Sequence, residues 1–66
     1  MRSNYETFVG LQAIDRKDHH IGTVTDIEYD DGKAWATIDD DFQINLANSV
    51  LVLDFITGAS YARIGN

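Results

Sequence analysis

Cysteine and proline are absent from this sequence of 66 residues, and glycine occurs only five times. Without cysteine, neither a disulfide nor a thiolate-held metal stabilises the fold, and a reducing compartment such as the cytoplasm suits the chain. Without proline or glycine-rich stretches, no linker divides the chain, so it forms one domain at most. A domain of this size lies near the lower limit for independent folding. Its stability therefore depends on a compact core, on self-association, or on both.

Basic residues are also scarce, since five lysines and arginines stand against eleven acids and leave a formal charge of −6. Proteins bind nucleic acids largely by neutralising phosphates with lysine and arginine, so we expect no nucleic-acid partner and no membrane partner. A protein with a basic surface fits this charge better. No apolar run approaches the roughly 20 residues of a membrane-spanning helix, and the first residues lack a signal-peptide core. We expect a soluble, cytoplasmic protein.

Short runs of β-branched and aromatic residues between polar turns predict an all-β fold. We expect a small single-domain barrel over residues 1–66, with about five strongly bent antiparallel strands and a loose lead-in over residues 1–7. The expected strands are FVGLQAID (8–15), IGTVTDIEYD (21–30), KAWATIDD (33–40), FQINLANS (42–49) and SVLVLDF (49–55), with YARI (61–64) as a short closing strand. NLANSV is a candidate for one helical turn. In the second strand Val24 is out of phase with Ile21 and Ile27, which predicts a bulge or bend between Gly22 and Asp26.

The turn after the second strand decides which way Trp35, the only tryptophan, points. If Asp31-Gly32 forms a two-residue type I′ turn, Trp35 pairs with Glu28 on the face opposite the apolar side chains. A three-residue loop with a bulge at the glycine instead shifts the pairing by one residue and turns Trp35 towards Ile27.

The next hairpin favours the outward position of Trp35. A three-residue loop of aspartates (39–41) gives cross-strand pairs that are all apolar on one face, with small residues opposite large ones. The two turns together predict the pairs Asp30–Lys33, Tyr29–Ala34, Glu28–Trp35, Ile27–Ala36, Asp26–Thr37, Thr25–Ile38, Ile38–Phe42, Thr37–Gln43, Ala36–Ile44, Trp35–Asn45 and Ala34–Leu46. The predicted core is Leu11, Ala13, Val24, Ile27, Ala34, Ala36, Ile38, Phe42, Ile44, Leu46, Val50 and Val52.

An outward Trp35 is the best candidate for a binding anchor, because one rigid ring removes a large apolar area from water. Its polar neighbours Glu28, Asp26, Gln43 and Asn45 form a rim suited to lysine or arginine on a partner. The alternative is that the N-terminal residues or the C-terminal YARIGN segment cover the ring within one chain.

The fifth apolar run, SVLVLDF, predicts a second contact surface, since both faces of residues 51–55 are apolar. Either a second copy of the chain covers one face in a homo-oligomer, or residues 56–64 fold back over it. The sequence leaves both arrangements open.

Residues that could carry catalysis or hold a metal are few. The three serines lack a nucleophile-elbow setting. Adjacent His19 and His20 lie beside Asp18 in a loop, but neighbouring residues of an extended chain point in opposite directions, and more ligands are needed. The aspartate-rich turns lack the spacing of a calcium loop and are typical of turn chemistry. We expect no catalytic residue, no metal site and no cofactor.

The stretch from residue 10 to residue 54 resembles two families of small, strongly bent barrels. Gly22, Val24 and Asp26 match the G-x-V-x-D pattern of PRC-barrel domains, and an acidic turn follows them at residues 30–32. LQAID (11–15) and the strands after it are spaced as in Tudor-like domains. Either resemblance implies a binding or adaptor role without catalysis.

A Tudor-type aromatic cage would draw on Tyr29, Trp35 and Phe42, although the first loop (16–20) supplies no phenylalanine, tyrosine or tryptophan. FQIN (42–45) is similar to the Val-Gln-Ile-Tyr stretch of plasmid-type dihydrofolate reductases, small barrels that work as tetramers. Gln43 and Ile44 match that stretch.

We therefore expect a non-catalytic protein-interaction or adaptor module that uses Trp35 on an acidic sheet face. An acidic decoy that occupies a nucleic-acid-binding site of another protein is the alternative, and an enzyme resembling the plasmid-type reductases is a remote one. The salt dependence of binding distinguishes the first two functions, because the affinity of a decoy for its partner falls steeply as the salt concentration rises.

Overall fold

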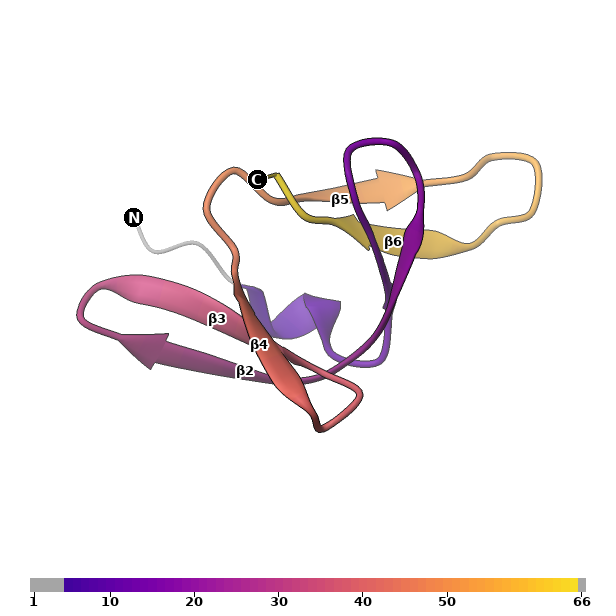
Figure 1. Cartoon of the computed structure of the whole chain (residues 1–66). Coiled ribbons are helices and arrows are strands. Elements are labelled where there is room, and N and C mark those ends of the chain that lie inside the picture. Colours follow the sequence, from indigo (N-terminus) through magenta and orange to yellow (C-terminus); the bar gives the residue numbers. More distant parts are fainter. Residues whose placement is uncertain (1–4, 66) are drawn as a thin grey trace.

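The strands of the computed structural model, which describes residues 5–65, join into one sheet with the order β4-β3-β2-β1-β6-β5 (Figure 1). A 3₁₀ helix precedes them. The elements are η1 (Tyr5–Phe8), β1 (Gln12–Ile14), β2 (His20–Asp30), β3 (Lys33–Ile38), β4 (Phe42–Asn45), β5 (Val50–Leu53) and β6 (Ser60–Arg63). The predicted all-β class is confirmed. None of the described helical segments is long and apolar enough to cross a membrane.

The sheet is open and mixed, which differs from the predicted barrel of about five antiparallel strands. The predicted closing strand does form, as β6, but it pairs in parallel with β1 and antiparallel with β5. Because β6 lies between these two strands, β5 and β4 are left as the two edges of the sheet in residues 5–65. The remaining pairs of neighbours are antiparallel.

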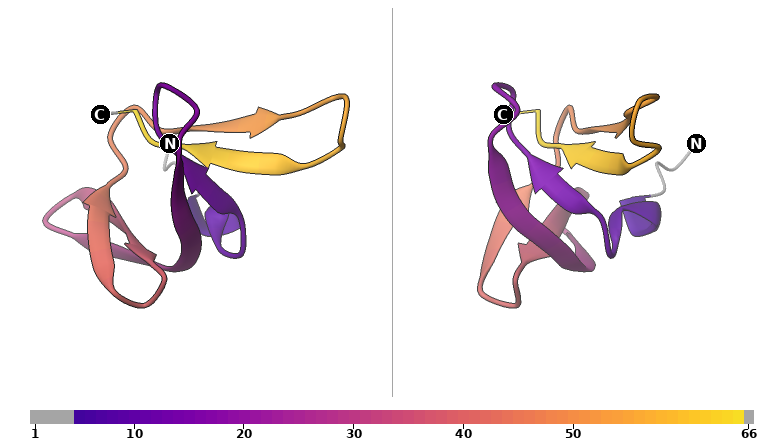
Figure 2. Two further views of the ribbon diagram at one scale, coloured as in Figure 1. Left: turned by 45° about the vertical axis from the view of Figure 1, so that its right-hand side comes forward. Right: turned by 90° about the vertical axis from the view of Figure 1, so that its right-hand side faces the viewer.

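The long strand β2 carries the chain from one half of the sheet to the other. Its first residues pair with β1 and its last residues pair with β3. The register shifts between Val24 and Asp26, which confirms the predicted bulge. β2 curves strongly at this point, so that β2, β3 and β4 diverge from β5 and β6 (Figures 1 and 2).

Both predicted hairpin turns are confirmed. Asp31 and Gly32 have φ angles of 50° and 75°, as a type I′ turn requires, and the pairs from Asp30–Lys33 to Asp26–Thr37 follow in the predicted register. The pairs between β3 and β4 are also as predicted, and the Leu46 N–H donates to the Ala34 carbonyl. The predicted pair Thr25–Ile38 is wrong. Thr25 is the bulged residue, so Val24 takes the place opposite Ile38.

The turn between β3 and β4 is tied to the bend in β2. The Thr23 N–H donates to the Asp39 carboxylate (3.0 Å), and the Asp39 N–H donates to the Thr23 carbonyl (2.9 Å). Next to them, the Thr25 hydroxyl donates to the Thr37 carbonyl and accepts the Asp40 N–H, both at 3.2 Å. The bulge therefore frees Thr25 to satisfy backbone groups of the turn.

Five predicted core residues are buried, and four others pack against the buried cluster. Ala13, Val24, Ala36, Ile38 and Leu46 are buried, while Leu11, Ile27, Ala34 and Ile44 are partly buried. The core assignments of Phe42 and Val50 are wrong, because both lie on edge strands and are 43% and 51% exposed. Val52, on the same edge strand, is half-buried and outside the core cluster.

Four buried apolar residues were not predicted: Phe8, Ile14, Ala62 and Ile64. They come from η1, β1 and the end of the chain, which contact the rest through long-range pairs. Part of the predicted loose lead-in is also ordered, since Tyr5 packs against the core and its ring lies edge-on to Phe8. Residues 1–4 of that lead-in lie outside the described residues. Residues 46–49 form a hydrogen-bonded turn in place of the candidate helical turn.

Gly22 is required by the close approach of β2 to the turn between β3 and β4. It has a φ of 153°, and a Cβ added there overlaps the Asp39 carboxylate and lies 2.6 Å from Ile38 Cγ2. We predict that Gly22→Ala lowers the free energy of unfolding by about 2 kcal/mol or more, since the buried Ile38 and the hydrogen-bonded Asp39 carboxylate must move. Urea denaturation followed by circular dichroism measures the change.

Gly10→Ala is the matched control for this prediction. Gly10 also has a positive φ, 90°, but nothing lies within 4 Å of an added Cβ. The control introduces backbone strain without a steric collision, so its free energy of unfolding is expected to fall by only about 1 kcal/mol. Equal losses for the two variants would contradict the role of close packing at Gly22.

Candidate functional site

Trp35 lies at the centre of β3, on the face of the sheet opposite the core. Its cross-strand partners are Glu28 on β2 and Asn45 on β4, whereas its chain neighbours Ala34 and Ala36 face the core. The predicted outward direction is therefore what the register gives. The expectation of an exposed ring needs correction, because Trp35 is half-buried. A central strand has neighbours on both sides, and their side chains cover part of a large ring.

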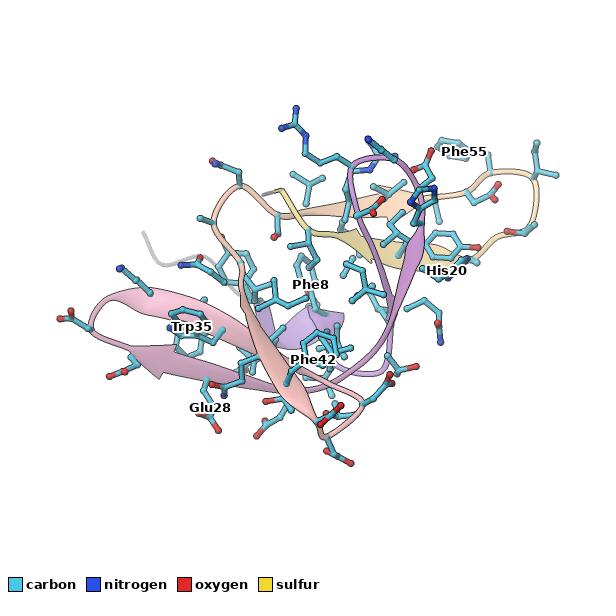
Figure 3. All side chains as sticks on the ribbon, in the orientation of Figure 1. Phe8, His20, Glu28, Trp35, Phe42 and Phe55 are labelled. Atoms are coloured by element: carbon cyan, nitrogen blue, oxygen red, sulfur yellow. The ribbon has the colours of Figure 1, made fainter. Side chains whose placement is uncertain are left out.

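The structure brings all five predicted site residues onto one face. Asp26 and Gln43 form the next cross-strand row after Glu28, Trp35 and Asn45, with Thr37 between them. The Gln43 amide donates to the Glu28 carboxylate at 3.2 Å, and this bond crosses over β3 from one flanking strand to the other. The Asn45 side-chain oxygen accepts the Ala47 N–H at 2.8 Å. These bonds fix part of the rim around Trp35. Figure 3 shows Trp35 and Glu28 on the acidic half of the sheet.

The alternative position for Trp35, beneath the N-terminal residues, is not what the described residues show. Tyr5 packs against the core cluster, which is the other face of β3, and it lines a hollow with Ala34 and Leu46. At the C-terminal end of the described residues, Gly65 packs closely against Asn48 in the β4–β5 turn, so closely that a Cβ added to Gly65 would overlap Asn48. Ile64 is buried in the core.

The whole formal charge of the protein is located in residues 26–41. This stretch holds seven acids and one base, whereas the other acids and bases of the sequence balance one another. The acids of the stretch are exposed in the structure, and the two described ion pairs, Asp15–His19 and Asp18–Arg63, lie outside it. We call residues 26–45 the acidic arm. Its electrostatic field attracts cations to the face that carries Trp35.

Most of the exposed large apolar side chains in the described residues lie elsewhere, on the hairpin of β5 and β6. We call this hairpin (residues 50–63) the apolar hairpin. β6 folds back beside β5, as one sequence alternative expected, but it pairs along one edge and leaves side chains of both faces uncovered. The exposed fractions are 51% for Val50, 55% for Leu51, 50% for Leu53, 89% for Phe55 and 96% for Ile56. The repeated apolar residues of SVLVLDF were the sequence signal for this surface. Phe55 belongs to that run, whereas Ile56, the most exposed side chain of the surface, was not predicted as part of it.

The turn of the apolar hairpin is ordered by Asp54, so Phe55 and Ile56 are held outwards. The Asp54 carboxylate accepts the Ile56 N–H (2.9 Å) and the Thr57 N–H (3.3 Å). The Asp54 N–H donates to the Ala59 carbonyl at 2.9 Å. These two hydrogen bonds hold the pKa of the Asp54 carboxyl below its usual value, and the bond from the Ile56 N–H has the larger effect. In Figure 3, Phe55 lies on this hairpin, well away from Trp35.

The side chains of the histidine loop have separate partners. His19 Nδ1 lies 3.5 Å from the Asp15 carboxylate, Asp18 accepts a hydrogen bond from Arg63 at 2.6 Å, and the His20 ring lies edge-on to Tyr61. Residues 5–65 contain no group of three or more histidine, cysteine, aspartate or glutamate side chains placed to hold a metal ion.

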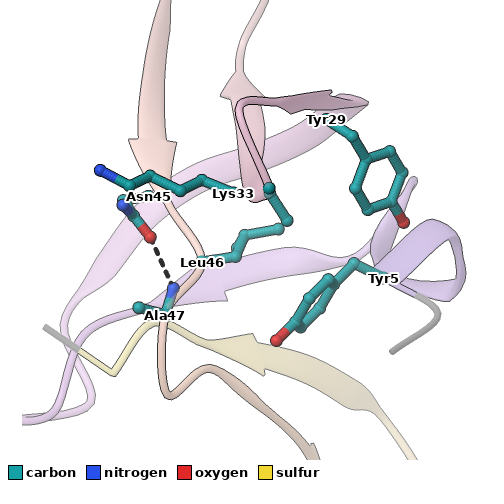
Figure 4. A pocket seen from close by; sticks show the side chains of 8 residues that line it. Tyr5, Tyr29, Lys33, Asn45, Leu46 and Ala47 are labelled. Atoms are coloured by element: carbon teal, nitrogen blue, oxygen red, sulfur yellow. Dashed lines mark hydrogen bonds between the residues drawn. The ribbon is translucent and has the colours of Figure 1, made fainter. Parts of the chain in front are cut away.

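The aromatic residues considered for a Tudor-type cage do not converge. Tyr29 and Phe42 lie on the core face, at opposite ends of the acidic arm, while Trp35 lies on the outer face. Tyr29 instead lines an open hollow of about 440 Å³ with Tyr5, Lys33, Asn45, Leu46 and Ala47 (Figure 4). This arrangement gives two tyrosines and one lysine at the hollow, which is not a cage for a methylated cation.

Comparison with known proteins found no matching family model, no matching curated protein and no matching solved structure.

The pH dependence of the hairpin turn follows from Asp54. A carboxyl whose pKa is lowered by folding stabilises the folded turn above its unfolded pKa of about 3.9, and this stabilisation is lost as the pH falls through the lowered value. We predict that the amide proton shifts of Ile56 and Thr57 titrate with a midpoint below that of an ordinary aspartate. Nuclear magnetic resonance measures this midpoint in a titration from roughly pH 2 to pH 6, a range that extends to both sides of the ordinary aspartate pKa.

Asp54→Asn is the matched control, because it retains a side-chain acceptor for the turn but cannot ionise in this range. In this variant the two amide shifts are expected to be independent of pH. A midpoint at or above the ordinary aspartate value in the unmodified protein would contradict the assigned hydrogen bonds.

Proposed function

We propose that the chain is a non-catalytic protein-interaction module of the cytoplasm, which docks on a basic protein surface through the outer face of the acidic arm. One observation carries the proposal: the only tryptophan lies on the same sheet face as Glu28, Asp26, Gln43 and Asn45, in the stretch that holds the whole net charge.

The two kinds of side chain on this face have different roles in the proposed contact. The acids attract a basic partner from a distance and raise the rate of association. Trp35 then supplies apolar contact area at small entropic cost, because its half-buried ring is already restrained by its neighbours. The hydrogen bond between Gln43 and Glu28 pre-orders the rim in the same way.

The resemblance to small bent barrels supports the same proposal. Its motif residues Gly22, Val24 and Asp26 lie at the bulged bend of β2, where glycine is required and Val24 enters the core. A bend of this kind is what such a motif needs in a strand that pairs with two different neighbours. An adaptor role follows from the resemblance by analogy alone.

The acidic decoy is the second candidate, and the location of the entire charge of −6 in one arm favours it. A decoy needs the density of negative charge and not the tryptophan. Substitution of Trp35 and the salt dependence of binding therefore distinguish the two functions.

We predict that Trp35→Ala weakens binding of a ten-residue peptide of alternating arginine and leucine by about 30-fold, the effect of losing a hot-spot aromatic residue. Binding of a deca-arginine peptide is expected to be nearly unchanged, since it depends on the acids. Isothermal titration calorimetry at low and high salt measures both peptides.

Tyr29→Ala is the matched control, because it removes an exposed aromatic residue from the core face of the same arm. It is expected to leave both affinities unchanged. If Trp35→Ala leaves the affinity of the alternating peptide unchanged and salt abolishes binding of both peptides, the decoy function replaces the proposed one.

A further inference from the structure

We infer that the apolar hairpin is the interface with a second copy of this chain, formed by antiparallel pairing of the two β5 strands. This surface is separate from the outer face of the acidic arm, so the inference does not depend on the proposed function. In Figures 1 and 2, the hairpin extends away from β2, β3 and β4.

The free edge of β5 is the first reason. β5 pairs with β6 on one side and is the last strand in the order of the sheet, so alternate residues direct N–H and C=O groups away from it. Proteins usually protect such an edge with charged residues, proline or a bulge. Residues 50–53 read Val-Leu-Val-Leu and pair with β6 in continuous register, without any of these features.

The exposed side chains suit a two-fold axis perpendicular to the sheet. Such an axis brings each face of β5 onto the same face of the second copy. Leu51 and Leu53 then meet the leucines of the other strand, and Val50 and Val52 meet its valines, because side chains alternate between faces. Pairs of this kind are closely spaced across antiparallel strands and remove apolar area from water on both faces at once.

The turn of the hairpin extends the same contact. Antiparallel pairing places the C-terminal end of one β5 beside the N-terminal end of the other. Phe55 and Ile56 follow β5 after the single residue Asp54, so they lie beside the β4–β5 turn of the second copy. Asp54 already orders this turn, so little conformational entropy is lost when Phe55 and Ile56 are covered.

The distribution of charge identifies the occupant as a second copy. The apolar hairpin contains one acid, Asp54, and one base, Arg63, so two hairpins meet without net repulsion. The acidic arm carries the charge of −6 and repels the arm of another copy. Two copies therefore approach each other through their hairpins. The resulting dimer presents two acidic arms, which strengthens binding to any partner with two basic sites.

Sedimentation equilibrium over a concentration series tests the inference. The unmodified protein is expected to form discrete dimers, and the double variant Leu51→Lys, Leu53→Lys is expected to raise the dissociation constant by more than about 100-fold, because like charges meet across the axis. Val9→Lys with Phe42→Lys is the matched control. Both of these residues are hydrophobic and nearly as exposed, but they lie outside the hairpin. Circular dichroism checks that each variant is folded, and the single variant Leu53→Lys replaces the double one if it is not.

Mixing provides the decisive measurement. The lysine double variant and the matching variant Leu51→Glu, Leu53→Glu are each expected to be monomeric, and their mixture is expected to form heterodimers at about the original affinity. Trp35 lies outside the interface, so its emission is expected to stay constant on dilution of the unmodified protein. A monomer at all concentrations, open-ended aggregates in place of dimers, equal loss in the control, or no association in the mixture would each overturn the inference.

Discussion

The bend in β2 is the constraint on which the rest of the sheet depends. A single strand of eleven residues pairs with β1 at one end and with β3 at the other, so the two halves of the sheet share one backbone. Gly22 allows the close approach, and the bulge at Thr25 turns the strand. Two hydrogen bonds then hold the bend in place: the Thr23 N–H donates to the Asp39 carboxylate, and the Asp40 N–H donates to the Thr25 hydroxyl. The small core forms on the inner side of this bend.

The parts of the fold that depend on local chemistry were predictable from the sequence. Asp31-Gly32 and the three aspartates after Ile38 each specify a turn, and each turn sets a register, so the face of Trp35 followed from counting residues. The order of β1, β6 and β5 did not follow in this way. Parallel pairing of β1 with β6 joins the two ends of the chain, and no turn between them records it. Ala62 and Ile64 were missed as core residues for the same reason.

The candidate site, too, was predictable from the sequence only in part. Trp35 and the four predicted residues around it lie on one face because side chains alternate along adjacent strands. The extent to which the ring is covered was not predictable, since it depends on side chains that cross from neighbouring strands, such as Gln43 bonded to Glu28. The apolar character of SVLVLDF was visible in the sequence. That β6 pairs beside β5 and leaves its faces uncovered could be seen only from the order of the strands.

The parallel pair of β1 and β6 has a consequence for how this chain folds. The hairpins of β2, β3 and β4 join residues close in sequence, whereas Ala13 and Ala62 are separated by most of the chain. Closing so long a loop costs entropy before any contact repays it, which slows this step relative to the hairpins. Ala62 and Ile64 belong to the buried cluster, so the core is complete only after this pairing. The domain therefore becomes stable only once residues 60–64 have been synthesised and β6 has paired with β1.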